Sequence, residues 1–290
     1  MNSTNYWKIL LVGLSLAGTI SLSACNEDPE EFTSDSDVAE SIVTDEAIAD
    51  DLFVDVDLIS DEASLYEGST QGGRLEDDDS ALLRDCVGRL LERREENKVF
   101  TKIVTLDFQE GCEGPKGRER QGTMVITRIT DANEATYTVS TTFQDFFLDG
   151  KKVEGTRTRI YTKLETGVHQ VAITLTDGKV TLEDGRIIER SGSFIKNQNR
   201  NSGEISVEGE ASGINRNGVA YTATVTSPLV YKQSCATEGI FMATQGTRSI
   251  AREGKADVTI DYGQGDCDKT VAVTVNGEER TLELTITKNN

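Results

Sequence analysis

The 290-residue chain carries 50 acidic and 30 basic side chains, which gives a formal net charge of −20, and it contains a single histidine. This charge argues against nucleic acid as a partner, because contact with phosphates needs a cationic surface. One histidine excludes sites built from several imidazoles, such as His-rich zinc centres.

Residues 1–25 have the anatomy of a secretory signal. Lys8 is the only charged residue there, and the apolar run of residues 9–20 is too short for a comfortable membrane span. The segment ends in Leu-Ser-Ala-Cys25, which resembles a lipobox, the processing site of bacterial lipoproteins. The resemblance implies cleavage before Cys25 and acylation of that residue, and several acyl chains hold a protein firmly at a membrane.

The negative charge is concentrated in the next segment. Residues 26–80 contain 20 acidic side chains and one base, Arg74, whereas residues 81–290 contain 30 acids and 28 bases. A helix over residues 37–66 gathers the apolar side chains into one stripe and leaves most carboxylates outside it. We therefore expect an acidic, solvated tether over residues 26–81 with an amphipathic helix near residues 37–66. We favour packing of its stripe on the chain's own β-domain over binding to a partner protein.

Residues 82–290 have the pattern of an antiparallel β-domain. Asp-Gly or Asn-Gly pairs, the strongest short hairpin signal, start at positions 149, 177, 184, 217 and 276. Apolar and Thr-rich positions alternate; the inward set of one strand would be Tyr137, Val139, Phe143 and Phe147. The pattern predicts an all-β meander of about 12–14 strands, preceded by one acidic helix. It leaves open whether the sheet is curved, a barrel or a sandwich.

Four cysteines follow Cys25. A motif ending in Cys112 is echoed by one ending in Cys267, and each has a cysteine upstream across a predicted hairpin, namely Cys86 and Cys235. Four cysteines allow three pairings in an exported protein. We expect the disulfides Cys86–Cys112 and Cys235–Cys267.

Two further features suggest sites, and a third, the single histidine, does not. Asp261, Asp266 and Asp268 supply oxygen ligands on a Gly-rich loop, which would suit Ca²⁺, although Asp and Gly also simply form turns. The triplet at 79–81 resembles a short O-glycosylation sequon of Bacteroidetes, which would place a glycan on Ser80. The only histidine, His169, alternates with Gln170 and so shares the face of Val171 and Ile173, and it is interpreted as a structural residue at the end of a strand.

The lipobox, the acidic helix and the two Thr-x-Asp-aromatic…Gly…Cys loops together resemble exported outer-membrane or surface lipoproteins of the Bacteroidetes. The resemblance implies β-rich domains at the cell envelope and supplies no catalytic residue. We therefore expect a lipid-anchored, non-enzymatic structural or binding module, facing the periplasm or, as we favour from the acidic residues after Cys25, the cell surface. The alternative is a carrier or assembly factor that holds a lipid or other apolar ligand on a curved sheet, and a hydrolase ranks behind both. The expected contacts are the membrane and a protein or lipid partner.

Overall fold

A computed structural model describes residues 35–65, 86–114, 117–165, 167–199, 201–237, 240 and 242–284. Two helices and one antiparallel sheet are formed within these ranges. The elements are α1 (Asp35–Leu65), β1 (Gly88–Glu96), β2 (Val99–Asp107), β3 (Cys112–Glu113), β4 (Glu119–Asp131), β5 (Thr136–Leu148), β6 (Lys151–Glu165), β7 (Val168–Thr181), β8 (Ile187–Asn199), β9 (Glu204–Ile214), β10 (Ala220–Lys232), α2 (Gln233–Thr237), β11 (Gln245–Ala251), β12 (Val258–Gln264), β13 (Thr270–Val275) and β14 (Glu278–Glu283).

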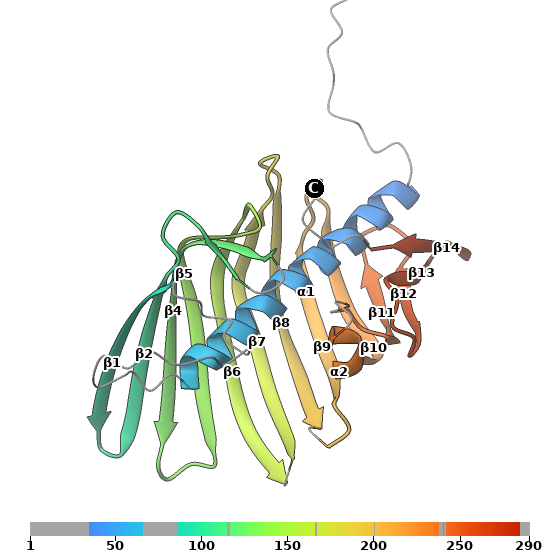
Figure 1. The fold of residues 1–290 in the computed structure, drawn as a ribbon. Coiled ribbons are helices and arrows are strands. Elements are labelled where there is room, and N and C mark those ends of the chain that lie inside the picture. The colour runs from blue at the N-terminus through green and yellow to red at the C-terminus, as the bar shows by residue number, and fades with distance from the viewer. Residues whose placement is uncertain are drawn as a thin grey trace, which may run out of the picture. The chain divides into compact units, whose positions relative to one another are not determined.

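The strands follow one another across the sheet in chain order, and only the short β3 lies off this path, paired with β4. The predicted all-β meander with one acidic helix before it is confirmed, and the sheet is curved and not closed (Figure 1). No helix in the described ranges is long and apolar enough to cross a membrane.

Four of the five predicted Asp-Gly or Asn-Gly pairs lie between neighbouring strands, at 149–150, 184–185, 217–218 and 276–277. The fifth prediction was wrong: Asp177 and Gly178 lie inside β7, at a β-bulge against β6 and β8. Asp177 has a φ of 50°, so the positive φ that makes Asp-Gly a turn signal serves here to kink a continuous strand.

Bulges and glycines interrupt the regular pairing of several strands. The register of β4 against β5 shifts next to Gly122, which has a φ of 79° and lies so close to the Asp145 carbonyl that a Cβ would be 1.9 Å from it. Such devices curve a sheet locally. The bulge also reverses the alternation of β5, so that Phe146 is fully buried and Phe147 is only half-buried, contrary to the expectation for Phe147.

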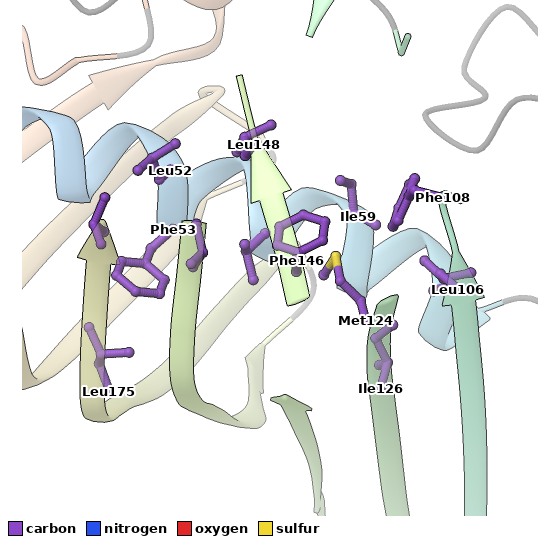
Figure 2. Close-up of a cluster of buried hydrophobic side chains, with 14 of the residues drawn as sticks. Leu52, Phe53, Ile59, Leu106, Phe108, Met124, Ile126, Phe146, Leu148 and Leu175 are labelled. Atoms are coloured by element: carbon purple, nitrogen blue, oxygen red, sulfur yellow. The ribbon is translucent and has the colours of Figure 1, made fainter. Parts of the chain in front are cut away.

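Helix α1 runs obliquely across one face of the sheet, which we call the inner face (Figure 1). Only Leu58 and Leu65 of its 31 residues are exposed. One apolar core joins the C-terminal half of α1, including Phe53, Val56 and Ile59, to strands β2–β8. Figure 2 shows Leu52, Phe53 and Ile59 among side chains of the strands. A second core joins the N-terminal part of α1, including Ile42 and Val43, to strands β10–β13.

Two disulfides brace this arrangement. They join Cys86 to Cys112 with Cα atoms 5.7 Å apart and Cys235 to Cys267 with Cα atoms 5.2 Å apart, which are the pairs named from the sequence. The first links the segment before β1 to β3, and the second links α2 to the loop between β12 and β13. Each loop closure restricts the unfolded chain and so stabilises the fold, by about 3 kcal/mol in the chain-entropy description.

Candidate functional site

The acidic side chains of α1 are not solvated as a group, contrary to the sequence-based expectation for this segment. Asp45, Glu46, Asp55 and Asp57 are all buried. They meet arginines that project from the sheet and its loops onto the inner face. The helix carries no basic residue, so every cation in these contacts comes from the β-domain. The arginines that pair with α1 are Arg118, Arg120, Arg157, Arg159, Arg190, Arg216, Arg248, Arg252 and Arg280.

Two carboxylates of α1 and two arginines of the sheet form an ion-pair cluster between the two apolar cores. Arg190 of β8 donates to Glu46 at 3.0 Å and to Asp50 at 2.7 Å. Arg248 of β11 donates to the same two carboxylates at 2.8 and 2.9 Å. Tyr221 donates its hydroxyl proton to the other oxygen of Glu46, at 2.6 Å. Glu46 and Asp50 are one helical turn apart, which lets two guanidinium groups bridge both.

A second group of pairs follows along the helix. Asp55 receives two hydrogen bonds from Arg120, at 2.6 and 3.0 Å, and Asp57 receives two from Arg157, at 2.7 and 2.8 Å. Arg159 donates to the Asp57 backbone carbonyl at 3.0 Å and to the Asp61 carboxylate at 2.7 Å. These contacts are directional and mostly buried, so they fix the rotation and the register of α1 on the sheet.

The acidity of the helix carboxylates depends on which guanidinium groups face them. Burial alone would raise the pKa of Asp50, but Arg190 and Arg248 outweigh it and lower that pKa to about 2. Burial is also the largest influence on Asp57, where Arg157, Arg159 and, more weakly, Lys196 bring the pKa below its usual value. At Asp45 and Asp51 burial prevails, and the pKa of each carboxyl is raised despite its arginine partner.

Acid titration of Asp50 gives a testable consequence. A folded-state pKa of about 2 against an ordinary 3.8 means that ionised Asp50 stabilises the fold above about pH 4 and that this contribution is lost as the pH falls towards 2. We expect Asp50→Asn to lower the free energy of unfolding by about 2 kcal/mol at pH 7 and by much less at pH 2.5. Urea denaturation at the two pH values measures this.

The matched control is Asp184→Asn, because Asp184 is paired with its near neighbour Arg186 and both side chains are nearly half exposed. We expect that variant to stay within about 0.5 kcal/mol of the parent chain at pH 7. An Asp50→Asn effect that is the same at both pH values would contradict the assignment.

Beside the second group of pairs, the inner face is not fully covered by α1. A cavity of about 540 Å³, which we call the trough, lies between α1 and strands β6–β11. Val54 and Leu58 of α1 line one side, and Leu58 is 44 % exposed. The sheet side includes Phe194 of β8 and Ile205 and Val207 of β9. The volume lies in the ordinary range for small-molecule sites, which are largely apolar with a few placed polar groups.

The polar groups of the trough are mostly paired with one another. Its carboxylates, Asp50, Asp57 and Asp61, are all held by the arginines described above, and Asp61 also accepts the hydroxyl of Tyr161. The two carboxyls with raised pKa, Asp45 and Asp51, do not line it. The trough can therefore bind an apolar ligand beside polar side chains that are held in place by their pairing with one another.

The residues singled out from the sequence lie elsewhere. Asp261 accepts the backbone N–H of Gly263, and Asp268 accepts both the N–H and the hydroxyl proton of Thr270, as turn-forming aspartates do. In the described part of the chain, no three metal-ligating side chains come together, and Asp266 has no assigned role. His169 stands opposite Gln198 in the sheet. Cys25 and Ser80 lie outside the described residues.

Sequence reasoning missed the arginines of the inner face. A signal was present: Arg157 and Arg159 alternate with Thr158 and Ile160, so the arginines take the positions that alternation assigns to one face. Residues 81–290 contain 30 acids and 28 bases, so the net charge of this region gave no sign of a group of arginines on one face. Their segregation to one face became visible only with the strand register.

No family model, curated protein or solved structure matches the chain.

Proposed function

We propose that this chain is a non-enzymatic ligand-binding module of the bacterial envelope that holds an apolar ligand in the trough. The observation that carries the proposal is the cavity of about 540 Å³ on the inner face, where α1 otherwise seals the sheet. The two cores on either side of it are packed and include fully buried side chains such as Ile42 and Ile59. If α1 served only to complete the apolar cores, larger side chains that fill the trough would add stability, because an unfilled cavity loses packing contacts.

The rest of the proposal concerns location. The lipobox-like segment ending in Cys25, the acidic residues after it and the resemblance to Bacteroidetes lipoproteins favour a lipid anchor in the outer membrane, with the module on the surface or in the periplasm. Tethering near a bilayer suits a protein that takes up or presents an apolar molecule. A purely structural module at the same place is the competing interpretation, and the trough favours binding.

A hydrolase has less support. General acid–base catalysis by two carboxyls needs one with a raised pKa next to one that is ionised. Among the described residues, the pKa of Asp50 and of Asp57 is lowered, and Asp45 and Asp51, whose pKa is raised, pair with Arg216 and Arg118 and do not line the trough. This separation supports binding over hydrolysis.

The test replaces Leu58, the exposed apolar side chain that lines the trough. N-phenyl-1-naphthylamine, a neutral apolar fluorophore, should bind the chain with increased fluorescence. Leu58→Asp should weaken that binding at least tenfold, because it places a carboxylate in the apolar wall.

Leu65→Asp is the control, because Leu65 is 65 % exposed on the same helix and does not line the trough. We expect it to leave the affinity unchanged. Absence of binding by the parent chain, or equal loss in both variants, would contradict the proposed function.

A further inference from the structure

We propose that the ligand of the trough is a single-chain anionic amphiphile, a long-chain carboxylate, whose head is bound by Lys196. This inference rests on the proposed function and adds the charge and the orientation of the ligand. It follows from the charge balance of the trough, the position of Lys196 in the sheet and the order of side chains along β8.

The charges around the trough balance except for its lysines. Four guanidinium groups, those of Arg157, Arg159, Arg190 and Arg248, face four carboxylates, those of Glu46, Asp50, Asp57 and Asp61. Lys196 also lines the trough, and within the described residues its ammonium group forms no hydrogen bond or salt bridge; the carboxylate that acts on it, at longer range, is Asp57, which already pairs with Arg157 and Arg159. The trough thus has a cation that its own carboxylates do not neutralise.

The sheet register places Lys196 in apolar surroundings. It stands between Val171 of β7 and Val207 of β9, so its stem lies in a row of buried or half-buried valines. A half-buried ammonium group without a close partner is unfavourable, because it loses hydration and shares the more distant Asp57 carboxylate with two guanidinium groups. An anionic ligand group would supply the missing partner.

Side chains along β8 give the ligand an orientation. Phe194, Lys196 and Gln198 alternate onto the inner face and line the trough in that order, from apolar to polar. Past Gln198 the trough adjoins a second cavity of about 480 Å³, and the two share Gly203, Lys232 and Gln233. The acyl tail therefore lies towards Phe194 and Phe53, and the carboxylate lies at Lys196 towards this polar end.

Lys232, at the polar end of the trough, contributes less to binding of the head group than Lys196 does. Its ammonium group donates to the Gly265 carbonyl at 2.6 Å, and Glu204 stands opposite it in the sheet register. Because Lys232 is engaged at the Gly265 carbonyl, Lys196 is the lysine that faces a head group, and one ammonium group suits a monoanionic carboxylate better than a doubly charged phosphate.

The experiment compares twelve-carbon amphiphiles that differ in the head: laurate, dodecanol, dodecyl phosphate and dodecyltrimethylammonium, all below their micelle concentrations. Each displaces N-phenyl-1-naphthylamine from the full-length chain carrying Cys25→Ser, which lacks the proposed acylation site. We expect laurate to displace the fluorophore at a concentration at least tenfold lower than dodecyltrimethylammonium does, and Lys196→Gln to remove this preference. Tenfold corresponds to about 1.4 kcal/mol.

Two further variants separate charge from folding. Lys196→Arg should retain the preference for laurate, and Lys179→Gln should not alter it, because Lys179 pairs with Glu154 and does not line the trough. If the fluorophore binds but laurate has no advantage, or keeps it in Lys196→Gln, the anionic ligand is refuted and the proposed function stands. A tenfold preference for dodecyl phosphate over laurate refutes the carboxylate. If the fluorophore does not bind the parent chain, both proposals fail.

Discussion

A chain shortened to residues 82–290 is expected to lose its cooperative thermal unfolding transition, although it retains strands β1–β14. Helix α1 supplies Leu52, Phe53, Val56 and Ile59 to one core and Ile42 to the other. Its removal would also leave arginines such as Arg120 and Arg159, at most 2 % exposed, without their carboxylates. Without α1 the inner face is open to water, so the large apolar side chains of both cores lose burial worth about 1.5–3 kcal/mol each, and the arginines face one another without counter-charges; a domain is stable by only about 5–15 kcal/mol. Calorimetry of the shortened and full chains measures the outcome.

A single substitution in α1 measures the contribution of the helix to stability without removing it. Phe53→Ala should lower the free energy of unfolding by about 3–5 kcal/mol, because the aromatic ring is 1 % exposed and its loss leaves a cavity. Leu65→Ala, at the exposed end of the same helix, should stay within about 0.5 kcal/mol of the parent chain. A shortened chain that melts at the parent temperature would instead assign α1 to a partner protein.

The second large effect concerns the Asp55–Arg120 pair. Asp55→Ala alone should cost about 3–5 kcal/mol, because it leaves the buried guanidinium of Arg120 without its carboxylate. The double variant Asp55→Leu with Arg120→Met should recover most of that loss, since an apolar pair of similar volume has no desolvation penalty. Urea denaturation of the single and double variants measures both changes.

The exposed pair of Glu92 and Arg94 is the matched control, with side chains 47 % and 70 % exposed. Glu92→Ala should change the stability by less than about 1 kcal/mol. If the double variant at Asp55 and Arg120 were as unstable as Asp55→Ala, the pair would contribute net stability, and the interpretation that it mainly specifies the helix register would be wrong.

Local patterns were sufficient to predict most of the sheet. Alternation and Asn-Gly or Asp-Gly pairs act between neighbouring residues, so a meander of consecutive hairpins can be predicted from them. The failures at Asp177-Gly178 and Phe147 have one cause. Residues with positive φ occur both in hairpin turns and in β-bulges. Such a residue lies in a bulge, and not in a turn, when the chain before it and the chain after it both pair with the same neighbouring strand.

The ion pairs of the candidate site could not be predicted from local patterns. The carboxylates that frame the trough are up to 15 positions apart in α1, but Glu46, Asp50, Asp57 and Asp61 lie within a narrow sector of the helix at 100° per residue. Their arginine partners lie 98–202 positions away in the sequence. No spacing rule connects residues at such separations, because the pairing depends on how the sheet curves around the helix.

The amino-acid sequence by itself determined that this protein is an antiparallel meander after one acidic helix, because strand periodicity, turn chemistry and helix periodicity are all local. Only the tertiary structure decided the environment of the acidic charge. The sequence indicated a helix that packs by its apolar stripe and leaves its carboxylates solvated, whereas the folded chain buries much of that charge against arginines that alternation collects on one face of the sheet. Burial of a charge depends on partners far along the chain, and so does the formation of the trough, whose lining comes from α1 and from strands β6–β11.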